Sequence, residues 1–211
     1  MTPDIIADIA LLVLKLIGIA ISAYLIGSIP TGYIIVKALK GIDIREVGSG
    51  STGATNVKRV LGTKWFFIVM LLDALKGAIP VLLTVHYLNF THFKGLSPVI
   101  AALFVIIGHC KPVFLKFKGG KSVATGIGTI IALCWPVGLI MAAVWGIITY
   151  LSKYVSLGSI IAISMAPILM NLFDQNIYYI YFAAICAIVV IILHKDNIKR
   201  LVEGKENKVR E

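Results

Sequence analysis

Long apolar stretches alternate with short polar ones along the chain. A membrane-spanning helix needs roughly 17–25 mostly apolar residues, and a water-soluble core of this size could not bury so many apolar runs. The pattern predicts an all-α, polytopic membrane bundle and a single domain over residues 1–211, with seven spans at residues 9–36, 65–86, 97–115, 122–134, 137–151, 156–172 and 177–193.

Two of these spans carry interruptions. The fourth is short, so it is either a half-helix or begins inside the polar segment before it. The segment from Gly27 to Gly32 lies within the first span and contains Pro30, which should kink that helix or permit close packing.

Composition and charge support a membrane protein. Hydrophobic residues make up 59% and charged residues 14%, whereas soluble domains carry about 25% charged residues. The net charge of +10 does not indicate a nucleic-acid partner, because the cations flank apolar spans. Seven spans would place 17 of the 20 Lys and Arg residues on one side. We expect that side to be cytoplasmic, with the N-terminus outside and the C-terminus inside.

The first unusual polar segment on this side is GSGSTGATNVKR, residues 48–59. Glycine-rich backbone can cradle an anion with successive N–H groups, and arginine presents a forked cation that suits phosphate. The alternative is a flexible loop with capping hydroxyls. We favour phosphate binding, and the predicted ligands here are Ser49, Gly50, Ser51, Asn56 and Arg59.

A second glycine-rich segment is FKGGKSVATG, residues 117–126. Glycines before a helix start point free N–H groups and the positive helix end at an anion. A nucleotide P-loop is excluded, because Leu115 stands where its first glycine is required. We interpret Lys116 and Lys118 as topogenic. The predicted phosphate ligands are Gly119, Gly120 and Lys121.

Two weaker signals follow. Ser156 and Ser159 are three residues apart, as are His194 and Asn197, so each pair shares a helix face. A histidine there can donate or accept a hydrogen bond or carry a proton, yet a lone histidine at a helix end is usually interfacial.

Asp73, Lys76 and His109 are ionisable residues inside spans. Asp73 and Lys76 are three residues apart in the second span, and ionisable groups at that depth need a partner. We interpret them as a mutual ion pair and His109 as structural. The cysteines are few and widely spaced, so they predict neither a disulfide framework nor a metal site.

In this order, GSIPTGYI, GSGSTGATNVKRVLG, FKGGKSVATG, KYVSLGSI and HKDNIKRLVEGKE resemble the motifs of bacterial acyl-phosphate:glycerol-3-phosphate acyltransferases of the PlsY type, over nearly the whole chain. The resemblance implies a multi-pass inner (plasma) membrane enzyme of seven helices with its active site at the cytoplasmic face. Such an enzyme transfers a fatty acyl group from acyl phosphate to glycerol 3-phosphate, giving 1-acyl-glycerol 3-phosphate (lysophosphatidic acid) and phosphate, an early step of phospholipid biosynthesis.

The resemblance also implies roles for single residues. Phosphate would be bound by Ser49, Arg59 and Lys121, and the site would be lined by Ser156, His194 and Asn197. Ser51 stands where the family usually has asparagine, and Ser122 where it usually has glycine. Neither departure removes a charge.

Acyl phosphate is already activated, so no Ser–His–acid triad is required. We expect positioning and charge neutralisation by segments that share one cleft. The predicted catalytic residues are Lys121, Ser156, His194 and Asn197. The base is either His194 or a substrate phosphate oxygen. We expect a monomer without cofactor. The competing classes are a transporter or channel for a phosphorylated small molecule and a lipid-binding scaffold.

Overall fold

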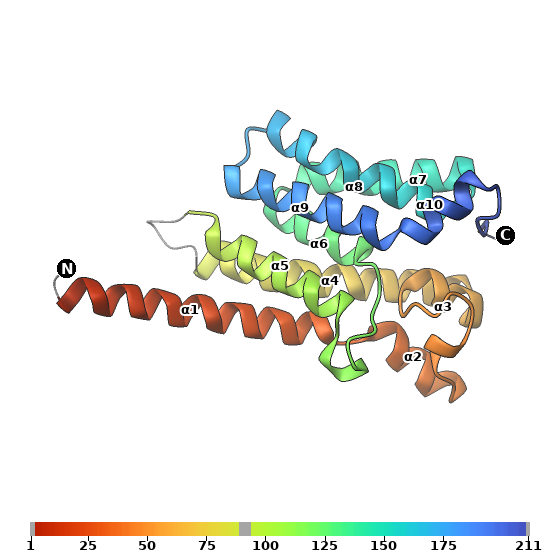
Figure 1. Cartoon of the computed structure of the whole chain (residues 1–211), viewed down its shortest axis with the longest axis horizontal. Helices are drawn as coiled ribbons and strands as arrows, with labels where there is room; N and C mark the ends of the chain where they lie inside the picture. The colour runs from red at the N-terminus through yellow and green to blue at the C-terminus, as the bar shows by residue number, and fades with distance from the viewer. Residues whose placement is uncertain (1–2, 89–93, 210–211) are drawn as a thin grey trace.

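The chain folds into a bundle of helices (Figure 1). The structure, a computed structural model, describes residues 3–88 and 94–209, and every regular element within them is helical. The α-helices are α1 Pro3–Ser28, α2 Thr31–Lys40, α3 Ala54–Leu61, α4 Thr63–Tyr87, α5 Leu96–Cys110, α6 Val123–Leu133, α7 Trp135–Ser152, α8 Val155–Leu172, α9 Ile177–Leu193 and α10 Lys195–Val202. The short 3₁₀ helices are η1 Ile44–Glu46 and η3 Val113–Leu115.

Each expected apolar stretch contains a helix, but the helices differ in length. Five stretches of the described chain are long and apolar enough to cross a membrane, and the pair α9 and α10, bent by 60°, would make a sixth. Helix α6 has only 11 residues, which is about 16 Å against a hydrocarbon core of about 30 Å. Of the two alternatives for the fourth stretch, the structure therefore shows the half-helix. The number of spans and the sides of the membrane on which the termini lie stay predictions.

The helix of the first expected span is interrupted at Pro30, as the sequence predicted. Helix α1 ends at Ser28, and Pro30 stands before Thr31, the first residue of α2. Proline has no N–H, so carbonyl groups in the preceding turn lose their usual donor. The Ile26 carbonyl accepts from the Ile29 N–H at 3.2 Å, and the Ile29 carbonyl accepts from the Thr31 N–H at 3.1 Å and from Lys76 Nζ at 2.8 Å. A buried cation thus caps the break.

Glycines let neighbouring helices pack closely. Helix α1 packs on α5, α4 on α6, and α8 on both α7 and α9 (Figure 1). A Cβ at Gly77 of α4 would lie 2.3 Å from the Thr125 carbonyl oxygen, and one at Gly128 of α6 would lie 2.0 Å from that of Ala74. Side chains there would force α4 and α6 apart, and these two helices form walls of the site described below.

The outer surface of the bundle is apolar. Large exposed side chains along the helices include Leu14, Ile17 and Ile21 on α1 and Ile185, Ile188 and Ile192 on α9. Such a surface would aggregate in water, whereas in a bilayer it contacts lipid tails. The polar helices α3 and α10, together with α2, lie toward the end of the bundle where the C-terminus is found, and the N-terminus of α1 lies at the other end (Figure 1).

Candidate active site

A cavity of about 770 Å³ brings all four polar segments together. Its walls come from α3, α4, α6, α7, α8 and α10 and from the loops before α3 and α6. The predicted site residues that line it are Ser49, Ser51, Asn56, Arg59, Lys121, Ser156, His194 and Asn197. The segments therefore share one cleft, as the phosphate-binding hypothesis requires.

The first glycine loop, residues 48–53, is shaped by Asn56. The Asn56 side-chain amide lies within hydrogen-bond distance of three carbonyl oxygens, those of Ile44, Val47 and Ser51, at 3.1, 3.0 and 2.9 Å. Its Oδ1 accepts from the Ser49 N–H at 3.0 Å. An amide has two N–H hydrogens, and here both are used inside the loop. Asn56, predicted as a phosphate ligand, therefore organises the loop.

Three predicted phosphate ligands, Gly50, Gly119 and Gly120, are not among the residues that line the cavity. The Gly50 N–H donates to the Val47 carbonyl at 3.1 Å, and the Gly120 N–H donates to the His109 carbonyl at 3.1 Å. A Cβ would lie 2.1 Å from the His109 carbonyl oxygen at Gly119 and 2.2 Å from His109 Nε2 at Gly120. Glycine at positions 119 and 120 thus lets the second glycine loop, residues 116–122, pack against α5, and their role as phosphate ligands stays a prediction.

The two departures from the family pattern are accommodated locally. Ser51 Oγ accepts from the Gly53 N–H at 3.3 Å, within the first glycine loop. Ser122 adopts a left-handed backbone with φ of 56°, a conformation that favours glycine. Its hydroxyl donates to the Ile106 carbonyl at 3.2 Å, which anchors the residue in spite of that conformation.

Lys121 belongs to a polar network that reaches the C-terminal segment. Its Nζ donates to Asn197 Oδ1. The Glu206 carboxylate accepts from Asn197 Nδ2 at 2.6 Å, from Ser156 Oγ at 2.8 Å and from Arg200 Nε at 2.7 Å. Sequence reasoning missed Glu206 and Arg200, both of which line the cavity. Arg200 could have been found, because it is three residues after Asn197 on the same helix face.

The charges of this network favour an anion. Burial, followed by repulsion from the Arg200 guanidinium, lowers the pKa of Lys121, and Arg59 adds to the effect. Burial acts to raise the pKa of Glu206, but the hydrogen bonds from Asn197, Arg200 and Ser156 outweigh it and lower that pKa overall. Arg200 and Arg59, from two other segments, thus repel the Lys121 ammonium, and a phosphate would relieve that repulsion.

His194 lies between α9 and α10 and is 3% exposed. Its Nδ1 lies 2.8 Å from the Val190 carbonyl oxygen. Because a carbonyl only accepts, Nδ1 carries the hydrogen and Nε2 is left as an acceptor. Burial, with a smaller contribution from Lys121, lowers the pKa of His194 to about 4. The imidazole is therefore neutral at physiological pH.

The rest of the cavity wall is apolar and belongs to α4, α6 and α7. It includes Phe66, Met70, Leu71, Ile127, Ile131 and Trp145. The lining of the cavity thus combines polar and cationic groups with apolar side chains suited to a hydrocarbon chain. In the described part of the chain, no three His, Cys, Asp or Glu side chains are grouped as a metal site.

The interpretation of the buried charges is confirmed for one pair. Asp73 Oδ1 lies 2.8 Å from Lys76 Nζ, and both side chains are buried. His109 is buried too, and its Nδ1 lies 3.0 Å from Thr125 Oγ1. Asp73 and His109 also line the cavity.

The fold and the site together define a multi-pass membrane protein with one cavity that has both cationic and apolar lining residues. The profile of the family described as glycerol-3-phosphate acyltransferase matches residues 17–204. This chain therefore belongs to the glycerol-3-phosphate acyltransferase family, in its PlsY-type branch.

Several relatives match almost end to end. The glycerol-3-phosphate acyltransferase of Trichormus variabilis is 44% identical over 205 residues, which cover 91% of each chain. That of Bacillus subtilis is 41% identical over 190 residues, or 90% of this chain and 95% of the relative.

Two solved structures of PlsY (YgiH), an integral membrane glycerol 3-phosphate acyltransferase, are also similar. The glycerol 3-phosphate form has a TM-score of 0.86 at 38% identity, and the lysophosphatidic acid form has a TM-score of 0.84 at 37% identity. Each alignment covers 93% of this chain and 96% of the solved one.

Proposed function

We propose that this protein transfers a fatty acyl group from acyl phosphate to the primary hydroxyl of glycerol 3-phosphate. The products are 1-acyl-glycerol 3-phosphate and inorganic phosphate, and the reaction is an early step of phospholipid biosynthesis. We place the site at the cytoplasmic face of the bacterial plasma membrane, in a monomer of one domain that works without a cofactor.

One observation supports the proposal most strongly. Arg59, Lys121 and Arg200 come from three separate segments and line the same cavity as the apolar side chains of α4, α6 and α7. Acyl phosphate has an anionic head and a hydrocarbon tail, and glycerol 3-phosphate adds a second phosphate. The cavity offers cations for both phosphates and an apolar wall for the tail, which would enter sideways from the lipid.

The residues divide between the two phosphates by position. Ser49, Ser51 and Arg59 belong to one wall, where the arginine can bind phosphate through two parallel N–H groups. Lys121 belongs to the second glycine loop and donates to Asn197 Oδ1. Ser156 and Glu206 orient that asparagine. Holding the reactants in contact supplies much of the rate enhancement.

In the transfer step, the primary hydroxyl oxygen attacks the acyl carbonyl carbon. The new ester C–O bond forms, the bond between that carbon and the phosphate oxygen breaks, and phosphate leaves with the electron pair. A phosphate oxygen is the better proton acceptor, because the second pKa of a phosphate monoester is about 6, whereas the pKa of His194 is about 4. His194 Nε2 then accepts a hydrogen bond from the attacking hydroxyl and orients it.

One assay tests the proposal against its competitors. Purified protein in detergent receives acyl phosphate and labelled glycerol 3-phosphate, and the expected product is a labelled lysophospholipid. Acyl-CoA replaces acyl phosphate in the control and should give none. Labelled glycerol 3-phosphate that entered proteoliposomes without an acyl donor would indicate a transporter. Binding without turnover or uptake would indicate a lipid-binding scaffold.

A further inference from the structure

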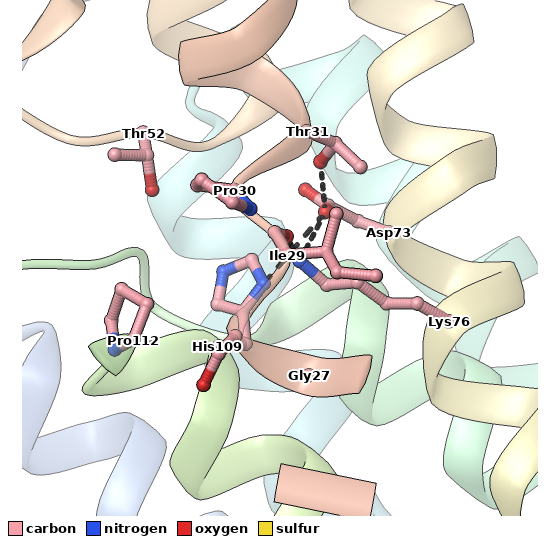
Figure 2. Close-up of a pocket in the computed structure, with 10 residues that line it drawn as sticks. Gly27, Ile29, Pro30, Thr31, Thr52, Asp73, Lys76, His109 and Pro112 are labelled. Carbon is pink, nitrogen blue, oxygen red and sulfur yellow. Dashed lines mark hydrogen bonds and ion pairs between the residues drawn. The ribbon is translucent and has the colours of Figure 1, made fainter. Parts of the chain in front are cut away.

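Ionisable side chains from two helices form a closed cluster next to the active-site cavity. Asp73 and Lys76 of α4 and His109 of α5 are 2%, 8% and 7% exposed. They face a space of about 10 Å³ (Figure 2), which is close to the volume that one water molecule needs. The space is too small for either substrate, although Asp73 and His109 also line the active-site cavity.

The cluster is fully connected. Besides its 2.8 Å ion pair with Lys76, Asp73 Oδ1 accepts a hydrogen bond from Thr31 Oγ1 at 2.5 Å and lies 3.8 Å from His109 Nδ1 (Figure 2). Lys76 also donates to the Ile29 carbonyl. A buried ion pair is weak evidence for stability, because well-packed apolar residues are often as stable. The cluster is thus better explained by the geometry that it fixes.

On one side the cluster reaches the first glycine loop. Thr31 begins α2, and a Cβ at the next residue, Gly32, would lie 2.1 Å from the Thr52 carbonyl oxygen. The start of α2 therefore packs directly on the backbone of that loop. Thr52 also faces the same small space as Asp73 and Lys76 (Figure 2).

On the other side it reaches the second glycine loop. The His109 carbonyl accepts the Gly120 N–H at 3.1 Å, and His109 Nε2 would lie 2.2 Å from a Cβ at Gly120. His109 Nδ1 lies 3.0 Å from Thr125 Oγ1 in the first turn of α6. The position of Lys121, between Gly120 and α6, thus depends on His109.

We propose that Asp73, Lys76 and His109 are positioning residues that fix the distance between the two glycine loops and so align the two substrates. The inference rests on the proposed function, in which each loop holds one phosphate. A displacement of about 1 Å from a reactive geometry can cost roughly a hundredfold in rate. A small shift of either loop would therefore slow transfer while each loop still bound its own phosphate.

The test uses the two hydroxyls that tie the cluster to its surroundings. A single change at Asp73 or Lys76 would leave a buried charge unpaired and could prevent folding. Thr31→Val and Thr125→Val remove one hydroxyl each with little change of shape, and the matching serine variants restore it. Thr84→Val and Thr129→Val are the controls, because these buried hydroxyls donate only to carbonyls of their own helices, each at 2.7 Å.

We expect kcat to fall roughly 10- to 100-fold in Thr31→Val and Thr125→Val, while the calorimetric Kd for glycerol 3-phosphate stays within about threefold of the wild-type value. The serine variants should recover most of kcat, and the two controls should stay within about twofold. An unchanged kcat, an equal loss in the controls, or a loss confined to KM would overturn the inference.

A second measurement does not depend on turnover. Spin labels on Glu46→Cys, next to the first glycine loop, and on Lys118→Cys, in the second, report the distance between the loops; both positions are exposed, whereas the native cysteines are buried or half-buried. The distance distribution should broaden or shift in the valine variants and recover in the serine variants. Equal distributions in all variants would refute the positioning role. Absence of acyl transfer by the wild-type protein would count against the proposed function alone.

Discussion

The substitution Lys121→Met tests whether the cavity is adapted to an anion. Without a ligand, the charged form of Lys121 is unfavourable, because burial and Arg200 lower its pKa. In the proposed function, this charge binds a phosphate. A neutral side chain of similar length should remove the unfavourable charge. Turnover should collapse while the fold persists.

The two effects differ in size. Loss of one preorganised donor at a developing charge costs about 2.7–4 kcal/mol, or roughly 10²–10³ in kcat. For stability, the loss of the hydrogen bond to Asn197 opposes the relief of the half-buried charge, so we expect a net change within about 1 kcal/mol. Because the folded-state pKa is lowered, the cost of the charge is fully present below that pKa and declines as pH rises through it.

The assay combines turnover with thermal unfolding in detergent. Phosphate at a hundred times its Kd should stabilise the wild-type protein by about 2.7 kcal/mol and should hardly affect the variant. Lys118→Met is the matched control, because this lysine is exposed, lies in the same loop and is absent from the cavity lining. Near-normal turnover by Lys121→Met, or a large drop in its unfolding temperature, would refute the reasoning.

Three further substitutions give distinct expectations. Arg59→Lys should raise the KM for glycerol 3-phosphate about tenfold in initial-rate titrations, because an ammonium lacks the guanidinium fork; an unchanged KM would contradict that contact. In a pH–rate profile, kcat should decrease at pH values below about 6, as substrate phosphate becomes protonated. The His194→Gln variant should show the same decrease, because the pKa of His194 is about 4. A variant profile without this decrease would identify His194 as the base. Glu206→Gln should lower the free energy of unfolding at neutral pH by roughly 1–3 kcal/mol in denaturant titrations. The folded-state pKa of Glu206 is lowered, so the carboxylate stabilises the fold above the ordinary carboxyl pKa and loses this effect as pH falls through the folded value. If the stability of the variant and of the wild-type protein depended equally on pH, this stabilising role of Glu206 would be ruled out.

Apolar helices with polar ends were predicted well from the sequence. The expected spans at residues 156–172 and 177–193 correspond closely to Val155–Leu172 and Ile177–Leu193. Hydrophobic length decides such helices, and polar or turn residues end them. Helix α3 was not predicted, because residues 37–64 are polar and glycine-rich, and most of α2 was predicted only as the part of the first span beyond its interruption.

The candidate site was predicted in part. Cations and hydroxyls at the helix ends converge on the cavity, as expected from their position at one face. The roles of Gly119 and Gly120 could not be predicted, because both depend on a tertiary contact with His109. Glu206 was missed for the same reason, since it meets Ser156 across fifty positions of sequence.

The last residues of the described chain form part of the reaction chamber. Beyond α10 the backbone turns back, and the Val209 N–H donates to the Lys153 carbonyl at 2.8 Å, which holds Glu206 in place. A shortened version ending at Val202, chosen for crystallisation because the charged tail looks dispensable, would discard Glu206 and Asn207, which line the chamber. Affinity tags fused at this end therefore need a spacer, and tags at the opposite terminus are the safer choice for activity measurements.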